Sequence, residues 1–522
     1  MFFLKKRKKP FVLAILDGWG LGKEDKKINA IFAAKTPFFD YACQTYGCAS
    51  LEASGEAVGL EKNQMSGSET GHLNIGAGRV VKQEVRIILE EISQGRFFGN
   101  PFLLSFLRQI KNNDSNIHLM GMLGNSDSPH SHPDIFLALL IFFKKHNFNG
   151  KKIFIHLFTD GRDSFPQSAL EHWQRWRGFW EKNQTGQLAT VCGRFWAMDR
   201  ADNWERSLKA FNLLVFGQGE KFSSFEKVIE KNYARGNSDE YIEPAVLETK
   251  DFHFPGIKAG DGIIFFNLRS DRARQLSKLF VGENNKKTSS FPCVEKIAHL
   301  SFLGLTDFGT DLALKTLYPS RPLSFTLPEV LTEKKQLYIA ETEKYAHITY
   351  FLNGGYAEPV AGEERIIIPS PKAHSYAEKP EMSARQITEI ILKNLHFDVY
   401  DFIAVNFANA DMVGHTGNFS ATKKAVETVD QCLKKIYEKI KEKEGVLFIT
   451  ADHGNADIML DVMSNQPFTF HTKNPVPFLA VGKTKKNNWR TDGKLADVTP
   501  TILEFMEINQ PEEMTGTSLR LN

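Results

Sequence analysis

The sequence predicts an α/β fold with a mainly parallel sheet flanked by helices. Short apolar runs rich in β-branched residues alternate with longer stretches of helical periodicity, which is typical of parallel α/β units. A length of 522 residues exceeds what one ordinary core accommodates, so two domains are expected. Several apolar runs also end directly in Asp or His, as happens where parallel strands deliver functional groups to one sheet edge.

Composition indicates a soluble globular protein, because 42% of the residues are apolar and 24% are charged. A formal net charge of +3 gives no reason to expect a nucleic-acid or membrane partner. The basic run Lys5–Lys9 is interpreted as a solvated tail in preference to a nucleic-acid arm. No uncharged run approaches the roughly 18 residues of a membrane span, and the N-terminal stretch lacks the features of a secretory signal.

The cysteines predict a reducing, cytoplasmic setting. They are odd in number, scattered and without the CxxC spacing of a zinc site, so neither a disulfide framework nor any other role is expected for them. The five are Cys43, Cys48, Cys192, Cys293 and Cys432.

Three apolar runs are each followed by side chains that bind metals. The groups are Asp17 after Phe11–Leu16, Asp411 and His415 after Asp401–Asn406, and Asp452 and His453 after Val446–Thr450. His471 precedes a further apolar run. Each group alone has an ordinary explanation, since Asp-Gly after a strand is usually a turn. Together they predict a metal site, and the mixture of imidazole and carboxylate suits Mn or Zn better than Ca. Six ligands exceed the need of one ion, so two ions clamping a phosphoryl group are expected.

A glycine-rich stretch, NQMSGSETGHLNIGAGRV, carries two serines at positions 66 and 68. It lacks the Gly-Lys-Ser/Thr ending of a phosphate loop and the Gly-x-Ser-x-Gly of a nucleophile elbow. A serine hydroxyl is a poor nucleophile until a base or a metal removes its proton. Small neighbours would let a phosphoryl group approach, so one serine is predicted to be a nucleophile. For Ser66 the structural alternative, that the hydroxyl satisfies backbone groups of the turn, is favoured.

On these residues the chain resembles the cofactor-independent (2,3-bisphosphoglycerate-independent) phosphoglycerate mutases of the alkaline phosphatase superfamily. The matching motifs include NQMSGSETGH, FTDGRD, FFNLRSDRARQLS, NADMVGHTG and TADHGNAD, and they extend from Leu16 to Leu519. The resemblance implies an alkaline-phosphatase-like metal domain formed by residues 1–82 and 319–522. A large α/β domain inserted at residues 83–318 would bind substrate and take part in phosphotransfer.

The resemblance also implies the site. Its nucleophile falls on Ser68, and Ser66 replaces a glycine of the family pattern. One ion would be held by Asp411, His415 and His471, and the other by Asp17, Ser68, Asp452 and His453. The ions would be manganese, with Mg²⁺, Co²⁺ or Zn²⁺ as alternatives. The implied substrate-binding residues are His130, Arg162, Asp163, Arg194, Arg200, Arg269, Arg272 and Lys344.

The arginines of this set suit a substrate that carries carboxylate and phosphate groups, because a planar guanidinium binds either group through two parallel hydrogen bonds. The segment before His130 departs from the family pattern: GNSDSPHSH has lost a double glycine and carries Pro129, which restricts the loop. Pro129 is therefore expected to change the backbone of the loop that carries His130.

The expected reaction interconverts 3-phosphoglycerate and 2-phosphoglycerate through a phosphoserine. Asp163 would shuttle the hydroxyl protons, and Lys344 would steady the phosphoryl group. Domain closure would exclude water, with hinges near Val81–Glu84 and Thr316–Ser324. A cytoplasmic monomer acting on a small molecule is expected. The alternatives are a phosphopentomutase or phosphomonoesterase with the same metal ligands, or a protein that binds nucleic acid through KKRKK.

Overall fold

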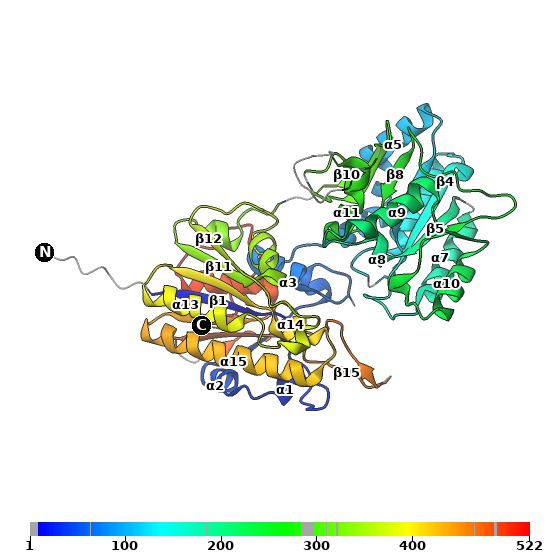
Figure 1. Ribbon diagram of the computed structural model, residues 1–522. Helices are drawn as coiled ribbons and strands as arrows, with labels where there is room; N and C mark the ends of the chain where they lie inside the picture. The colour runs from blue at the N-terminus through cyan, green and yellow to red at the C-terminus, as the bar shows by residue number, and fades with distance from the viewer. Residues whose placement is uncertain are drawn as a thin grey trace. The chain divides into compact units, whose positions relative to one another are not determined.

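Two eight-stranded sheets organise the chain, each flanked by helices, which confirms the predicted α/β class with its mainly parallel sheet (Figure 1). The computed structural model describes residues 9–521 except 63, 127, 184, 283–291, 293, 295, 310, 320–321, 464 and 485–487. The chain divides into two compact units, Met1–Gln83 with Arg321–Asn522 (unit 1) and Glu84–Ser320 (unit 2). Lys5–Lys8, Cys293 and part of the second expected hinge lie outside the described residues.

In unit 1 the strand order is β12-β11-β13-β1-β14-β17-β2-β19. The four strands β11, β13, β1 and β14 run parallel, whereas β17 is antiparallel to β14. Their bounds are Gln336–Glu341 (β11), Phe402–Phe407 (β13), Phe11–Leu16 (β1), Val446–Thr450 (β14) and Val476–Gly482 (β17). Leu16 lies opposite Phe407 and Ile15 opposite Thr450, so neighbouring strands end at the same level. The segments after them therefore start at one edge of the sheet.

The longest helix of unit 1 is α15 (Phe419–Glu442), which packs on β14 and β17 and against α2 (Pro37–Tyr46) and α13 (Ala384–His396). It starts where the side chain of Asn418 accepts a hydrogen bond from the N–H of Ala421, an N-cap. Its buried residues recur at helical spacing along one face, and burial of their apolar side chains stabilises the helix against the sheet.

Further elements of unit 1 are α1 (Ala30–Ala33), β2 (Ala49–Glu52), η1 (Gly55–Val58), α3 (Ser68–Ala77), α12 (Leu327–Val330), η5 (Thr342–Lys344), η6 (His347–Phe351), β12 (Glu363–Ile368), η7 (Tyr376–Glu378), α14 (Asn409–Gly414), β15 (Leu460–Asp461), β16 (Gln466–Pro467), β18 (Asn488–Trp489), β19 (Gly493–Lys494), η8 (Leu495–Asp497), α16 (Val498–Phe505) and β20 (Arg520–Leu521).

In unit 2 the strand order is β10-β9-β8-β3-β4-β5-β7-β6. The six strands from β10 to β5 are parallel, and β7 is antiparallel to β5. Their bounds are Ile117–Met122 (β3), Ile153–Thr159 (β4), Gln187–Gly193 (β5), Glu220–Phe222 (β6), Ala245–Leu247 (β7), Gly262–Phe265 (β8), Ser301–Thr306 (β9) and Lys315–Tyr318 (β10). The helices and turns are α4 (Glu84–Ser93), η2 (Arg96–Gly99), α5 (Pro101–Asn112), α6 (Pro133–Lys145), η3 (Gly150–Lys152), α7 (Ala169–Asn183), α8 (Arg194–Ala197), α9 (Trp204–Phe216), α10 (Phe225–Ala234), η4 (Asp239–Tyr241) and α11 (Ser270–Val281).

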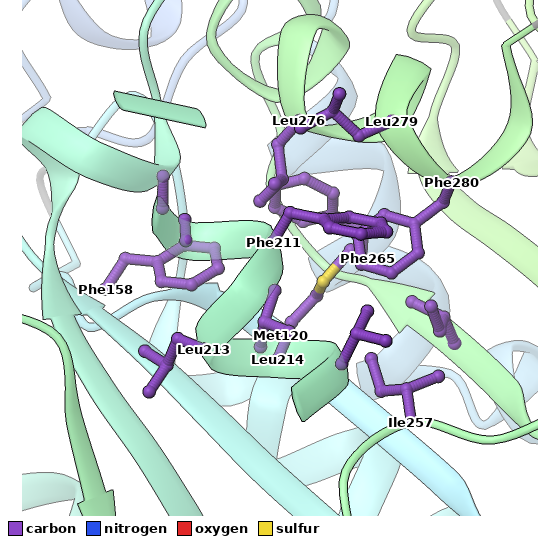
Figure 2. Packing of buried hydrophobic residues seen from close by; sticks show 14 of the residues in the cluster. Met120, Phe158, Phe211, Leu213, Leu214, Ile257, Phe265, Leu276, Leu279 and Phe280 are labelled. Carbon is purple, nitrogen blue, oxygen red and sulfur yellow. The ribbon is translucent and has the colours of Figure 1, made fainter. Parts of the chain in front are cut away.

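Aromatic side chains fill much of the core of unit 2. Figure 2 shows Phe211 of α9 packed with Phe280 of α11 and Phe265 of β8. The ring centroids of Phe211 and Phe280 are 4.9 Å apart, and Phe265 meets Phe308 edge to face at 5.3 Å. This layer fixes α9 and α11 on the sheet and so positions the segments next to them.

Among the described helices, none is both long enough and apolar enough to cross a bilayer.

Candidate active site

Three of four neighbouring parallel strands in unit 1 are followed at their carboxyl ends by predicted metal ligands, and the fourth is followed by Lys344. Asp17 follows β1, Asp411 lies in α14 after β13, Asp452 and His453 follow β14, and Lys344 ends the turn after β11. Because these strands end at one sheet edge, the side chains meet there although they come from distant parts of the sequence.

Ser68 is the first residue of α3 and lies at the centre of this group. Its hydroxyl oxygen is 3.1 Å from Asp17 Oδ1 and 2.9 Å from His453 Nε2. The Lys344 ammonium donates to the same oxygen at 2.7 Å. The side chain is 6% exposed, so the hydroxyl is held among charged groups with little access to bulk water.

Two glycines of the glycine-rich stretch allow α3 to approach the loop after β14. A Cβ on Gly71 would lie 2.5 Å from the carbonyl oxygen of Asp452, closer than any side chain tolerates. A Cβ on Gly67 would lie 3.2 Å from the ring of His471. The glycines therefore position Ser68 against the two loops that carry the metal-type residues.

Ser66 differs from its expected role. Its buried hydroxyl has no hydrogen-bond partner among the described residues, whereas its carbonyl oxygen is 2.8 Å from Nδ1 of His471. The backbone of Ser66 orients a histidine, and its side chain has no visible part in the site.

One group of three possible ligands consists of Asp411, His415 and His471. The Nε2 atoms of the two histidines lie 3.1 Å and 3.3 Å from Asp411 Oδ1 and 3.1 Å from each other. Each Nδ1 faces a backbone carbonyl, that of Thr469 at 2.7 Å for His415 and that of Ser66 for His471. A carbonyl partner fixes the proton on Nδ1 and leaves Nε2 as the ligand nitrogen.

The second set of possible ligands surrounds Ser68. Asp17, Asp411 and His453 offer mutually close ligand atoms, and so do Asp17, His72 and Asp452. His453 Nε2 lies 3.4 Å from Asp17 Oδ1 and 3.5 Å from Asp452 Oδ2. Its Nδ1 is 3.2 Å from the carbonyl oxygen of Gly454, so Nε2 again faces the carboxylates.

Lys344 bridges the two sets. Its ammonium donates to Asp17 Oδ1 at 2.8 Å and to Asp411 Oδ2 at 2.7 Å. Burial disfavours the charged form, but the carboxylates of Asp17, Asp411 and Asp452 outweigh burial and raise the pKa of Lys344. The side chain is therefore a permanent cation beside the Ser68 hydroxyl.

The donor set fits divalent cations. Asp17, Asp411 and Asp452 are each at most 2% exposed. Oδ2 of Asp452 is buried, and within the described part of the chain it accepts no hydrogen bond, although Nδ1 of His72 lies 3.2 Å away. Burial opposes protonation of His453, yet Asp452 and the neighbouring carboxylates outweigh burial and raise its pKa to about 9. A site that binds a proton this strongly attracts positive charge. Ligand atoms 3.1–3.3 Å apart, as in the Asp411 group, also suit an ion bound at about 2.0–2.2 Å.

Unit 2 gathers a second polar cluster at the carboxyl ends of its own strands. Arg194, the first residue of α8 after β5, forms an ion pair with Asp163 and another with Asp160 Oδ1 at 2.5 Å. His130 Nε2 is 3.1 Å from both Asp163 Oδ2 and Arg194 Nη2. His130 is 1% exposed, and burial lowers its pKa to about 4. The altered loop with Pro129 thus still places His130 beside Asp163.

The other predicted arginines lie around this cluster. Arg200 and Arg269 both approach the carboxylate of Asp271, at 2.6 Å and 3.4 Å. Arg272 donates to the carbonyl oxygen of Met198 at 3.3 Å. Burial, followed by the positive charges of Arg200, Arg194 and Arg162, lowers the pKa of Arg272 to about 9. Because these arginines repel one another, a bound anion would stabilise them in this arrangement.

Arg162 is the most open member of the predicted set. Its side chain is 55% exposed, and its Nη1 atom is 3.8 Å from Glu240 Oε1, an ordinary surface ion pair. Asp163, its neighbour in sequence, is 36% exposed and points into the His130 cluster.

Sequence reasoning missed several side chains that support the site. Asn406, the penultimate residue of β13, donates to Asp17 Oδ2 at 2.8 Å and lies 3.0 Å from Nε2 of His72. Asn455 donates to Asp411 Oδ1 at 3.2 Å. Asp160 was also missed, although a carboxylate directly after a strand, in FTDGRD, is the same signal that identified Asp17. For the two asparagines the sequence holds no comparable signal.

Comparison with known proteins places the chain in a family. A family model described as the metalloenzyme superfamily matches residues 9–510. The 2,3-bisphosphoglycerate-independent phosphoglycerate mutase of Clostridium perfringens strain SM101 is 44% identical over 516 residues, covering 98% of this chain and 99% of the relative. The enzyme of the same name from Clostridium kluyveri is 45% identical over 522 residues with the same coverage.

A solved structure agrees over the whole length. The phosphoglycerate mutase of Leishmania mexicana, crystallised at low cobalt concentration, superposes with a TM-score of 0.84 at 27% identity, and the match covers 99% of both chains. The resemblance inferred from the motifs is confirmed. The chain belongs to the family of 2,3-bisphosphoglycerate-independent phosphoglycerate mutases within the metalloenzyme superfamily.

Proposed function

We propose that this chain is an isomerase that interconverts 3-phosphoglycerate and 2-phosphoglycerate through a phosphorylated Ser68. Family membership supports the reaction, and one observation carries the assignment of the nucleophile. The Ser68 hydroxyl lies within 3.1 Å of a carboxylate, an imidazole and an ammonium group at the sheet edge. No 2,3-bisphosphoglycerate is needed, because the phosphoryl group is carried by the enzyme itself.

With a divalent ion bound, the Ser68 hydroxyl would lose its proton to water. The first transfer then forms a bond between Ser68 Oγ and phosphorus and breaks the bond between phosphorus and the substrate oxygen, which takes up a proton and becomes a hydroxyl of glycerate. Asp17 Oδ1 accepts the hydrogen bond of the hydroxyl and orients its lone pair. The Lys344 ammonium donates to Ser68 Oγ and would donate to the oxygens of a phosphoryl group in transit. Bound divalent ions would stabilise negative charge on the transferring oxygens. The reverse transfer, to the other hydroxyl of glycerate, completes the isomerisation.

Asp163 is proposed as the group that exchanges protons with the glycerate hydroxyls. Its Oδ2 atom is held by Arg194 and lies 3.1 Å from His130 Nε2, so its orientation is fixed. Its 36% exposure leaves it open to a bound molecule. Arg162, Arg200, Arg269 and Arg272 would hold the carboxylate and phosphate of the substrate together with Arg194. The domain at residues 83–318 would thus bind substrate, and that at residues 1–82 and 319–522 would bind metal.

The residues proposed for one ion are Asp411, His415 and His471, and those for the other are Asp17, Ser68, Asp452 and His453. Carboxylate and imidazole ligands together suit manganese, and Mg²⁺, Co²⁺ or Zn²⁺ are alternatives. A monomer in the cytoplasm, with no nucleic-acid or membrane partner, is proposed as the working state.

An enolase-coupled assay tests the function, because enolase consumes 2-phosphoglycerate. With 3-phosphoglycerate and Mn²⁺ the chain should support the coupled reaction without added 2,3-bisphosphoglycerate, and a chelator should abolish it. Release of inorganic phosphate without 2-phosphoglycerate would instead identify a phosphomonoesterase. Formation of ribose 5-phosphate from ribose 1-phosphate would identify a phosphopentomutase.

A further inference from the structure

Three segments that carry proposed metal ligands meet at one buried carboxylate of unit 1, that of Asp457. The segments are the loop after β1 with Asp17, the loop after β14 with Asp452 and His453, and the stretch before β17 with His471. Asp457 lies in the second of them, at the end of the motif TADHGNAD, and the residue is 1% exposed. The proposed reaction gives this carboxylate no role.

The carboxylate of Asp457 holds the segment that carries His471. Thr472, the residue after His471, donates its hydroxyl hydrogen bond to Asp457, at 3.1 Å from Oδ1 and 2.9 Å from Oδ2. The side-chain amide of Asn474 donates to Oδ2 at 2.6 Å. The backbone of Thr472 also pairs with that of Gly454 in an antiparallel bridge, in which its N–H donates to the Gly454 carbonyl oxygen at 2.8 Å. The His471 segment is therefore fixed to the loop after β14 by side-chain and backbone hydrogen bonds together.

The loop after β1 packs against the same residue. A Cβ on Gly20 would lie 2.4 Å from Asp457 Cγ, and a Cβ on Gly22 would lie 2.7 Å from the carbonyl oxygen of Asp457. Both distances are shorter than any side chain tolerates, so the two glycines permit this contact. The backbone N–H of Leu21 donates to the carbonyl oxygen of Pro475 at 2.7 Å, which joins this loop to the segment before β17 as well. Asp457 thus lies where all three segments touch.

We propose that Asp457 is a positioning residue, which holds the three segments so that their ligand atoms can bind both metal ions. The inference rests on the ligand sets proposed above. A buried carboxylate is costly unless it is hydrogen-bonded, and Asp457 receives its side-chain donors Thr472 and Asn474 only when the His471 segment is in place. Residues behind metal ligands fix the orientation of those ligands, and their loss typically weakens metal binding or activity about 10–100-fold. Asp457 would act in this way through Thr472, the neighbour of a ligand.

Titration of the metal-free full chain with Mn²⁺ tests this role, with the electron paramagnetic resonance signal of free Mn²⁺ as the readout. Wild type should bind two ions per chain, and Asp457→Ala should bind them about 10–100-fold more weakly. Asp430→Ala is the matched control, because Asp430 is a buried carboxylate of α15 that accepts hydrogen bonds from the N–H groups of Phe38 at 3.2 Å and Phe39 at 2.8 Å in α2. Both variants should have a lower Tm, but Asp430→Ala should keep the wild-type Mn²⁺ affinity.

Thr472→Val gives a milder test, which stays decisive if Asp457→Ala does not fold. It keeps the shape of the side chain, removes one donor to Asp457 and should weaken Mn²⁺ binding about tenfold. The inference is overturned if Thr472→Val and a folded Asp457→Ala bind Mn²⁺ as tightly as wild type does, or if Asp430→Ala loses as much affinity as Asp457→Ala. Wild type that binds no Mn²⁺ would contradict the proposed ligand sets, and the inference would fall with them.

Discussion

At the scale of single residues, the chemistry depends on which of two nearby serines meets the charged groups. Ser68 and Ser66 are both buried. The start of α3 directs the Ser68 hydroxyl to Asp17, His453 and Lys344. The Ser66 hydroxyl has no hydrogen-bond partner among the described residues. Burial alone does not distinguish them, so the difference lies in hydrogen bonding.

We predict that Ser68→Ala lowers kcat by at least about 10⁴-fold, because the group that carries the phosphoryl is removed. Ser66→Ala should retain most of the activity, since the carbonyl that orients His471 is unchanged. The enolase-coupled assay measures both, and circular dichroism checks that both fold. An inactive Ser66 variant beside an active Ser68 variant would show that the nucleophile is misassigned.

Lys344 leads to a second prediction at this scale. Lys344→Met removes a buried cation from among three buried carboxylates, and such a loss typically destabilises a protein by about 3–5 kcal/mol. We expect a lower Tm in the metal-free protein, a smaller loss when Mn²⁺ neutralises the carboxylates, and loss of turnover with metal present. Lys483→Met is the control, because its surface pair with Glu444 should contribute at most about 1 kcal/mol. Equal Tm values for Lys344→Met and wild type without metal would contradict this electrostatic role.

At the scale of elements, the strands that end in ligands were readable from the sequence. Phe11–Leu16 and Val446–Thr450 have the bounds of β1 and β14, and Asp401–Asn406 differs from β13 by one residue at each end. An apolar run that stops at a charged residue marks a strand end because a charged side chain needs polar partners that the apolar sheet interior lacks. Asp17 and Asp452 are themselves buried, but among the polar groups of the site. Asn406 and Asn455 were not predictable, since their contacts exist only after strands distant in sequence have paired.

A buried row of side chains crosses four adjacent strands of unit 2. His118 of β3 lies 3.0 Å from His156 of β4 and 3.1 Å from Asp261 before β8, and His156 contacts Thr190 of β5 at 2.8 Å. Burial lowers the pKa of His118, and burial together with the charge of His118 lowers that of His156 well below the ordinary value. The two histidines therefore stay largely uncharged in the folded sheet, whereas burial of Asp261 is outweighed by its hydrogen bonds, which lower its pKa.

From this we predict that unit 2 loses stability in acid. Below the ordinary histidine pKa of about 6.5 the unfolded chain binds protons that the folded chain does not, so the free energy of unfolding falls as pH falls towards the lowered values. Each histidine contributes up to about 1.4 kcal/mol per pH unit in that window. Denaturant unfolding followed by tryptophan fluorescence reports on this unit, which holds five of the seven tryptophans.

His156→Gln should reduce the pH dependence of the free energy of unfolding by up to the equivalent of one bound proton, about 1.4 kcal/mol per pH unit. His253→Gln is the control and should leave the slope unchanged, because the side chain of His253 is 73% exposed. Parallel pH curves for wild type and His156→Gln would contradict the assignment of the effect to this row.

At the scale of the whole molecule, the chain passes between the two units twice. Within each unit, a hydrogen bond joins the two chain segments that lead to these connections. In unit 1 the guanidinium of Arg79 donates to the carbonyl oxygen of Ser324 at 2.8 Å. In unit 2 the Tyr318 hydroxyl donates to Glu91 Oε2 at 2.8 Å. The first proposed hinge, Val81–Glu84, lies between these anchors, and the second, Thr316–Ser324, includes the anchors Tyr318 and Ser324.

Isomerisation competes with hydrolysis once Ser68 carries the phosphoryl group. A phosphoserine open to water would be lost as inorganic phosphate, so the substrate should draw the two units together while the phosphoryl group is transferred. We expect small-angle scattering of Ser68→Ala with Mn²⁺ to show a smaller radius of gyration when saturating 3-phosphoglycerate is present. The variant binds substrate without consuming it, which keeps the sample in one state. Arg272→Ala in the same background is the control. It removes one of the arginines proposed to bind the anionic substrate, an arginine that its neighbouring arginines repel, so it should abolish the decrease in radius of gyration without unfolding unit 2. Superimposable curves with and without substrate would mean that the enzyme protects its intermediate without moving its units, and water would then have to be excluded by the buried surroundings of Ser68 alone.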